Sequence, residues 1–265
     1  MDMEHFSDQD FAEERRKKIV NLIRRDKRVT VNQLVELCLV SAGTVRNDLK
    51  ELEQAGMLVR THGGAVVPTV PVRGEIALPL REGTNTDKKE AIAREAVKLI
   101  KDGESVFLDA GTTSLALARE LSRTDRSFIA VVNDFHIAEA LEESERGQIV
   151  FIGGVVRKKN HNTSGRVDLD MLKRYMVEKV FLTADAVSAD KGATTYLVQD
   201  IQYKRIVMAN AAKKIILADS TKLGRHVFAQ FASVEEIDTV VTDSAADAAI
   251  VSELEEKGVE VFVAP

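Results

Sequence analysis

Residues 31–52 (VNQLVELCLVSAGTVRNDLKEL) carry the pattern that most constrains the fold of this chain, because two short helical segments are joined there by a tight turn. Apolar residues recur at helical spacing in both segments, namely Leu34, Val35 and Cys38 in the first and Val45, Leu49 and Leu52 in the second. Ser41 stands between them, where its hydroxyl can accept a backbone N–H and cap the second helix. The pattern predicts a supporting helix, a turn and a second helix held against a small core.

The outward face of the second helix is polar and basic, and it holds Thr44, Arg46, Asn47 and Lys50. Recognition helices place such residues in the major groove of DNA, where Arg and Asn can pair with guanine and adenine edges. Lys or Thr can reach phosphate or base. Taken alone, however, these residues on a short helix are most often only a solvated face. The prediction of DNA binding therefore depends on the flanking segments.

Both flanking segments match a winged helix. Residues 13–23 (EERRKKIVNLI) predict an amphipathic helix with a basic start, and residues 58–67 (LVRTHGGAVV) predict a hairpin around a Gly-Gly turn. Arg60 and His62 flank that turn and can reach the DNA backbone or the groove beside the recognition helix. We therefore predict an N-terminal winged helix-turn-helix that binds double-stranded operator DNA through Ser41, Thr44, Arg46, Asn47, Lys50, Arg60 and His62.

The chain is expected to hold two domains joined by a linker. Residues 68–86 are irregular and interrupted by proline, which removes backbone donors and resists helix formation. This places a winged-helix domain at residues 1–67 and a second domain at residues 87–265.

The second domain alternates short apolar strands with helices. Continuous Val, Ile and Phe runs between helices indicate strands buried on both faces, which implies an α/β Rossmann-like domain with a mainly parallel sheet. The expected strands cover residues 105–108, 129–132, 149–152, 180–183, 214–218, 239–241 and 259–263. The expected helices cover residues 88–100, 115–121, 135–143, 169–176, 200–212 and 246–256.

The segment after the first of these strands has the chemistry of an anion site. It contains Asp109, Gly111, Thr112, Thr113 and Ser114, and a helix follows at once. Glycine permits close backbone approach, the hydroxyls donate hydrogen bonds, and a helix N-terminus supplies free N–H groups, so phosphate is the expected anion. The same residues also fit an ordinary N-cap that follows a glycine turn. Local chemistry leaves these two interpretations equal.

Polar residues follow other strands as well. Asn133, Asp185 and Lys222 each come after a predicted strand, and ligands of such sheets bind beyond the carboxyl ends of the strands. Carboxylates and an amide suit sugar hydroxyls, and a lysine suits a phosphate. Each residue is unremarkable alone, but their recurrence at one sheet edge favours a site for a phosphorylated sugar.

Charge and composition bound the function further. A net charge of −5 argues for a local DNA-reading head on a neutral-to-acidic body, because DNA affinity rises with the number of neutralised phosphates. The one cysteine and five scattered histidines offer no metal-ligand spacing, so no metal and no cofactor are expected. The sequence also lacks a signal peptide and a membrane-length apolar run. We therefore expect a cytoplasmic protein without membrane contact.

Two groups of motifs resemble the DeoR family of bacterial transcriptional regulators. Residues 14–65, with ERRKKIVNLI and VSAGTVRNDLKELEQAGMLVRTHGGA, are similar to the family's DNA-binding domain. The later blocks LDAGTTS, VVND, FIGGVVR, KVFLTADAVS, KGATT, YKR and LADSTKLGR are similar, in order, to its sensor domain. That domain is related in fold to ribose-5-phosphate isomerase and glucosamine-6-phosphate deaminase.

The resemblance implies a repressor whose operator binding is modulated by a phosphorylated sugar or a related metabolite. It carries the phosphate loop over to Asp109, Gly111, Thr112, Thr113 and Ser114. It also carries a further anion contact over to Lys222, and it places Asn133, Asp185 and Lys204 at the sugar end.

Two other hypotheses stay open at this stage. The chain could be a sugar-phosphate isomerase or deaminase with a DNA-binding head, for which Asp109 and Asp185 could serve as general bases. It could also be an oligomeric binding module without a ligand. Self-association as a homodimer or homotetramer is expected in every case, because a lone winged helix reads few base pairs and two heads can pair across a symmetric operator.

Overall fold

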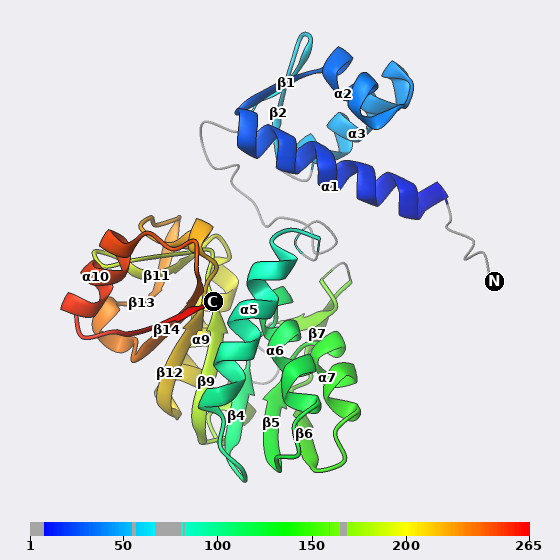
Figure 1. The fold of residues 1–265 in the computed structure, drawn as a ribbon. Coiled ribbons are helices and arrows are strands. Elements are labelled where there is room, and N and C mark those ends of the chain that lie inside the picture. The colour runs from blue at the N-terminus through cyan, green and yellow to red at the C-terminus, as the bar shows by residue number, and fades with distance from the viewer. Residues whose placement is uncertain (1–7, 55–56, 67–80, 82, 159, 165–168) are drawn as a thin grey trace. The chain divides into compact units, whose positions relative to one another are not determined.

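The computed structural model describes residues 8–54, 57–66, 81, 83–158, 160–164 and 169–265. The chain divides into two compact units, Met1–Thr84 and Asn85–Pro265, which are considered separately below (Figure 1). Most of the predicted linker lies outside the described residues, so its boundaries stay a prediction.

The first unit is a winged helix-turn-helix, as predicted. Its elements in chain order are α1 (Asp8–Asp26), β1 (Arg28–Thr30), α2 (Val31–Cys38), α3 (Ala42–Gln54), β2 (Val59–Thr61) and β3 (Gly64–Val66). The predicted inward residues form its core, since Leu34, Val45, Leu49 and Leu52 are each at most 1% exposed. Helix α2 starts with a capping box, in which Thr30 and Gln33 satisfy each other's backbone N–H groups.

The wing contains a third strand that the sequence pattern did not reveal. The strand order is β1-β3-β2, and Thr30 of β1 lies opposite Gly64 of β3. A Cβ atom on Gly64 would lie 1.9 Å from the carbonyl oxygen of Val29, so only glycine allows β3 to approach β1 this closely. The turn itself is formed by His62 and Gly63, whereas Gly64 already belongs to the strand. The expected Gly-Gly turn is therefore corrected by one residue.

A buried carboxylate joins α1 to α3. Asp48 is 1% exposed and accepts from Arg15 Nη2 at 3.1 Å and from Arg16 Nε at 3.0 Å, while Arg15 Nε lies 2.5 Å from its other oxygen. Arg16 also pairs with Glu51 at 2.6 Å. Two arginines of the predicted basic start of the first helix are therefore engaged within the unit. They are used to hold the recognition helix in place.

The second unit is built on a parallel sheet, as predicted. Seven strands pair in parallel among the described residues. In spatial order they are β15 (Glu260–Ala264), β14 (Thr239–Asp243), β12 (Ala211–Leu217), β9 (Val177–Thr183), β4 (Ser105–Leu108), β5 (Phe128–Val132) and β6 (Gly147–Phe151). Each agrees with an expected strand to within a few residues.

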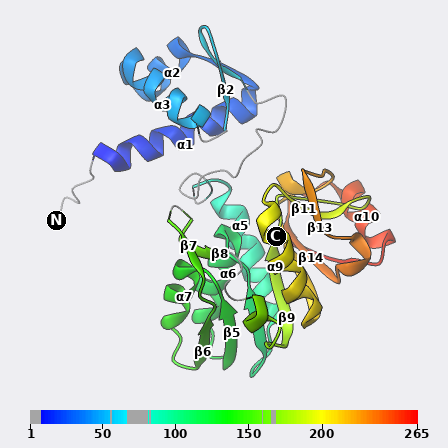
Figure 2. The same ribbon diagram turned by 180° about the vertical axis from the view of Figure 1, so that it is seen from behind.

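Helices cover both faces of this sheet (Figures 1 and 2). One face packs against α5 (Thr86–Ala96), η1 (Val97–Leu99), α6 (Thr112–Ser122) and α7 (Phe135–Glu142). The other packs against α8 (Leu169–Leu172), α9 (Val198–Ala209) and α10 (Ala248–Glu256). Successive strand residues alternate between the two cores, so that Val106 and Leu108 lie in the first and Phe107 in the second. Among the helices that the structure describes, none has the length and apolar character that a membrane crossing requires.

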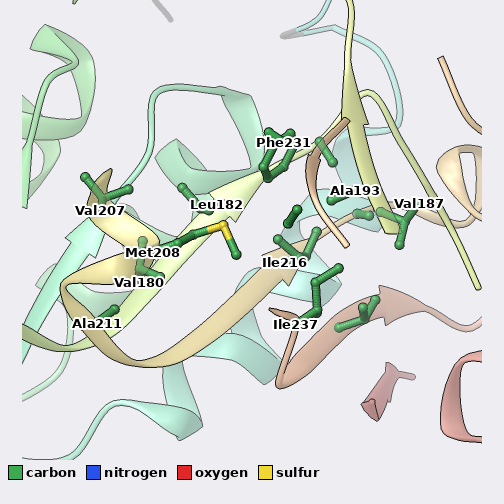
Figure 3. Packing of buried hydrophobic residues seen from close by; sticks show 14 of the residues in the cluster. Val180, Leu182, Val187, Ala193, Val207, Met208, Ala211, Ile216, Phe231 and Ile237 are labelled. Atoms are coloured by element: carbon green, nitrogen blue, oxygen red, sulfur yellow. The ribbon is translucent and has the colours of Figure 1, made fainter. Parts of the chain in front are cut away.

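Two small antiparallel sheets were not predicted. Strands β7 (Val155–Arg157) and β8 (Asn162–Ser164) form a hairpin, and β10 (Ala186–Ser188), β11 (Gly192–Thr195) and β13 (Ala229–Ala232) form a three-stranded sheet. The short helices η3 (Ser220–Lys222) and η4 (Val234–Glu236) flank β13 in the chain. Figure 3 shows its Phe231 in one apolar cluster with Leu182 of β9, Met208 of α9 and Ile216 of β12. The three-stranded sheet therefore contributes apolar residues to the same core as α9.

Replacement of Asp48 by Ala should destabilise the winged helix, because it leaves Arg15 and Arg16 without their buried partner. Loss of one member of such a pair costs roughly 2–4 kcal/mol when the other members are partly exposed. Amide hydrogen exchange of the full-length chain measures this as faster exchange across α1 and α3, with residues 85–265 unchanged.

The matched control is Glu51→Ala on the same helix, because the Glu51 side chain is 43% exposed. An exposed ion pair contributes well under about 1 kcal/mol. Equal exchange rates in the two variants would show that the buried carboxylate does not hold α1 to α3.

Candidate functional site

The outward face of α3 has the exposure that a recognition helix needs. Arg46, Asn47 and Lys50 are exposed, while Thr44 is half-buried. Ser41 caps the helix as predicted, since its Oγ accepts from the Thr44 backbone N–H at 3.1 Å and lies 2.9 Å from Thr44 Oγ1. The face therefore offers an arginine, an amide and a lysine to a groove.

The wing is tied to the end of the same helix. The backbone N–H of Arg60 donates to Glu53 Oε1 at 2.8 Å, and the Arg60 guanidinium lies 3.8 Å from Glu53 Oε2. Arg60 and His62 are both exposed. All seven residues predicted to bind DNA thus lie on one small unit, six of them exposed, and their role stays a prediction.

In the second unit, the predicted phosphate loop lies where the strand order reverses. From β4 the chain moves outward through β5 to β6, and then returns to the other side of β4 through β9, β12, β14 and β15. Ligands of such sheets bind at this switch point, beyond the carboxyl ends of the two central strands. Asp109 follows β4 and joins the end of β9, because its Oδ2 accepts from Thr183 N at 3.0 Å and Thr183 Oγ1 at 2.9 Å.

The loop leads directly into α6, which begins three residues earlier than expected. Thr112, Thr113 and Ser114 form its first turn, and the N-cap residue is Gly111, so no side chain caps the helix. Thr113 and Ser114 are buried, and Ser114 Oγ has no hydrogen-bond partner among the described residues. The capping interpretation of these hydroxyls is therefore wrong. An uncapped helix N-terminus beside an unpaired buried hydroxyl is suited to an anion.

Gly111 is required by the backbone of this loop. Its φ of 150° and ψ of 161° lie in a region that is essentially restricted to glycine. A Cβ atom there would lie 3.1 Å from Thr183 Cγ2. The end of β9 therefore packs directly against the loop.

Asp109 and Lys204 bind one another rather than facing a ligand alone. Lys204, on α9, is 5% exposed; its Nζ donates to Asp109 Oδ2 and, at 2.8 Å, to the carbonyl of Thr183. The ammonium also lies 4.9 Å from the centre of the Phe231 ring. The resemblance placed Lys204 at the sugar end. Here its ammonium is paired with Asp109 beside the loop, and its contact with a sugar stays a prediction.

Tyr203 was not singled out from the sequence, yet it links two predicted residues. Its hydroxyl lies 3.2 Å from both Asp109 Oδ1 and Asn133 Oδ1. Burial raises the pKa of Tyr203 well above its ordinary value, and the charge of Asp109 adds to this. The hydroxyl therefore stays protonated and can donate. Asn133 in turn donates from Nδ2 to the carbonyl of Thr163 at 3.1 Å.

Asp185 is engaged with the small sheet. Its Oδ2 accepts from Thr195 Oγ1 and from Tyr196 N, each at 3.0 Å. This holds the segment that follows β11 near the end of β9. The structure therefore brings Asp185 to the same sheet edge as Asp109, where it joins one loop to another.

Lys222 lies one strand further along, in η3 after β12, and is half-buried. A second lysine, which the sequence analysis missed, reaches this edge from α5. Lys88 Nζ donates to Ser220 Oγ at 2.5 Å and lies 3.0 Å from Asp243 Oδ1. Burial opposes ionisation of Asp243, but hydrogen bonds from Ser220 and Lys88 outweigh it and lower its pKa. No sequence signal marks Lys88, because it follows no strand.

Comparison with known families covers most of the chain. The family model of the DeoR-like helix-turn-helix domain matches residues 15–70, and that of the DeoR C terminal sensor domain matches residues 84–244. The first range contains all of the predicted DNA-binding residues, and the second contains all of the predicted effector-binding residues.

Curated relatives match over almost their whole length. The chain is 36% identical to the HTH-type transcriptional regulator GlpR of Haloferax volcanii, with 94% of this chain and 96% of that protein covered. It is 34% identical to the HTH-type transcriptional repressor GlcR of Bacillus subtilis, with 96% of each covered. It is 29% identical to the glycerol-3-phosphate regulon repressor of Escherichia coli, with 87% and 90% covered.

Among solved structures, ribose 5-phosphate isomerase A from Methanocaldococcus jannaschii is similar to part of the chain. The match has a TM-score of 0.40 at 25% identity and covers 54% of this chain and 56% of the isomerase.

Substitution of Gly111 by Ala should destabilise the second unit by about 2–3 kcal/mol, because alanine is strained at this φ and its methyl group meets Thr183. The tyrosines of the chain, Tyr175, Tyr196 and Tyr203, all lie in this unit. Urea unfolding followed by tyrosine fluorescence therefore reports the second unit alone.

Gly103→Ala is the matched control. Gly103 also has a positive φ, of 79°, but a Cβ atom there would meet nothing within 4 Å. Its substitution should cost only about 1 kcal/mol. Equal losses in the two variants would contradict a special role for the packing of the loop against β9.

Proposed function

The chain belongs to the DeoR family of transcriptional regulators, and on that premise we propose that it is a repressor whose binding to operator DNA is modulated by a phosphorylated sugar or a related metabolite. The first unit contacts the DNA, and the second binds the effector. The three relatives described above are named as regulators or repressors, and they favour this function over a sugar-phosphate isomerase or deaminase.

The DNA-binding part of the proposal is supported by the geometry of α3. Its apolar side packs into the core of the unit, and the opposite side exposes Arg46, Asn47 and Lys50. Asp48 lies on the buried side and is held by two arginines of α1, which fixes the rotation of the helix about its axis. A recognition helix needs such a fixed rotation to present the same side chains to each base pair.

Arg46→Ala should weaken binding to operator DNA by roughly 1–3 kcal/mol if Arg46 reads a base edge, and it should weaken binding to random DNA by much less.

Arg60→Ala in the wing should weaken binding to operator DNA and to random DNA by similar factors. It should also reduce the slope of log affinity against log salt concentration by up to about one unit. Fluorescence anisotropy titrations at several salt concentrations measure both effects.

Arg119→Ala serves as the control for loss of one positive charge, because Arg119 is exposed on α6 of the second unit. It should leave both affinities unchanged. Operator affinity that survives Arg46→Ala would refute the proposed base contact.

The effector part of the proposal is carried by one observation, the hydroxyl of Ser114 in the first turn of α6, which has no partner in the part of the chain that the structure describes. Ser114 is fully buried, so bulk water cannot hydrogen-bond to its hydroxyl. A buried hydroxyl without a hydrogen-bond partner destabilises the protein. A phosphate on the helix N-terminus would accept from this hydroxyl and from the amides of the first turn. The name of the Escherichia coli relative, a glycerol-3-phosphate regulon repressor, agrees with a phosphorylated effector.

Ser114→Ala should weaken binding of inorganic phosphate and of glycerol 3-phosphate by about tenfold to a hundredfold, since a hydrogen bond to a charged group contributes roughly 1.5–3 kcal/mol. The stability of the unliganded protein should change little, because the hydroxyl has no partner to lose. Thermal shift and calorimetric titration measure the two effects.

Ser144→Ala is the matched control. Ser144 Oγ is also buried without a partner among the described residues, but Ser144 follows the C-terminal end of α7, at the opposite edge of the sheet. Its substitution should leave phosphate affinity unchanged. If phosphate raised the melting temperature of Ser114→Ala as much as that of the wild type, the proposal that phosphate binds at this loop would be wrong.

We also propose that the protein acts as a homodimer or homotetramer in the cytoplasm, where operator DNA lies. One winged helix contacts few base pairs, and two heads related by two-fold symmetry bind a symmetric operator with higher affinity. Light scattering of the purified full-length chain determines the number of copies.

A further inference from the structure

Among the described residues, another buried polar atom without a partner lies in the hairpin of β7 and β8. Asn162, the first residue of β8, is 8% exposed, and its Oδ1 has no hydrogen-bond partner among the described residues. An amide oxygen buried in this way is costly unless another group satisfies it. No sequence pattern predicted a role for Asn162.

The hairpin lies over the carboxyl end of β5. Thr163 N donates to the Asn133 carbonyl at 2.9 Å, and Thr163 Oγ1 donates to the Ile152 carbonyl at 2.8 Å. Asn162 itself forms an antiparallel bridge with Asp134. Strand β8 is thereby fixed at the sheet edge that holds the phosphate loop.

The side chain of Asn162 shares a face with that of Arg157. These residues are directly opposite in the antiparallel hairpin, and opposite residues point to the same side. Arg157 reaches Asp200 of α9, at 3.9 Å. Asn162 therefore lies on the side of the hairpin that faces α9.

The same face of α9 leads to the phosphate loop. Tyr203 and Lys204 are three and four residues after Asp200, so all three lie on one side of the helix. Tyr203 and Lys204 are the residues that contact Asp109 at the base of the loop. The hairpin that carries Asn162 and the phosphate loop that carries Ser114 therefore both contact α9 at this edge of the sheet. Among the described residues, Asn162 Oδ1 and Ser114 Oγ have no partner there.

We propose that Asn162 Oδ1 accepts a hydrogen bond from a hydroxyl group of the effector, whose phosphate is held at α6. This rests on the function proposed above and adds a residue that determines specificity. An amide oxygen repels a phosphate oxygen that carries no proton, whereas it pairs with a hydroxyl. The effector is therefore a hydroxylated monophosphate, and Asn162 distinguishes it from phosphate alone.

The test compares inorganic phosphate with hydroxylated monophosphates, by calorimetric titration of the full-length chain. The probes are glycerol 3-phosphate, ribose 5-phosphate, fructose 6-phosphate and glucose 6-phosphate, and the tightest binder is carried forward. Asn162→Ala should lower the affinity for that ligand at least tenfold and change the affinity for inorganic phosphate less than twofold. Ser114→Ala should weaken both. Asn162→Leu removes the acceptor, keeps the branched four-atom shape of the side chain and should reproduce the Asn162→Ala result even where the smaller alanine side chain lowers stability.

Other outcomes would overturn the proposal in distinguishable ways. Unchanged affinity for every monophosphate in both Asn162 variants would mean that the amide oxygen binds only water. An equal loss for phosphate and for the hydroxylated ligand would mean that Asn162 only supports the loop. If the wild type bound neither phosphate nor any monophosphate, the proposed effector class itself would fail, and the role of Asn162 with it.

Discussion

The second unit depends on how one buried carboxylate is held at the switch point of its sheet. Asp109 ends β4, and donors from Thr183 at the end of β9 and from Tyr203 and Lys204 on α9 surround its two oxygens. A buried charge is tolerated only when it is paired and hydrogen-bonded. Because the partners come from separate segments, satisfying Asp109 fixes two central strands, a helix and the start of α6 relative to one another. The proposed effector loop is therefore preorganised by interactions that a ligand need not supply.

The winged helix uses the same principle on a smaller scale. Asp48 faces inward from α3 and is neutralised by Arg15 and Arg16 of α1, so the recognition helix is fixed in rotation by charge as well as by apolar packing. Arg46 and Asn47 precede Asp48 in the sequence but face outward. A buried carboxylate in each unit thus orients the element that carries the proposed contacts, which are to DNA in one unit and to a metabolite in the other.

Periodic patterns predicted the regular elements well. The apolar spacing of Val45, Leu49 and Leu52 defined the buried side of the recognition helix, and the runs of apolar residues defined the parallel strands, because burial on one or two faces leaves a direct trace in the order of residues. The three-residue strands β1 and β8 left no such trace. Polar side chains were harder to interpret. The position of Thr112, Thr113 and Ser114 before a helix fitted a cap and an anion site equally, and the structure excluded the cap, because Gly111 occupies the N-cap position.

The sequence by itself determined the class of each unit, the outward face of α3 and the polar segments at the carboxyl edge of the sheet, since all of these follow from local periodicity and from the residues after each strand. The tertiary structure decided which charges are available. Lys204 and Asp109 are 95 residues apart and neutralise each other, and Asp48 pairs with Arg15 and Arg16. Ser114 and Asn162 each keep a polar atom that no described residue pairs with. Pairing between distant side chains depends on how strands and helices are ordered in space, and no local pattern encodes that order.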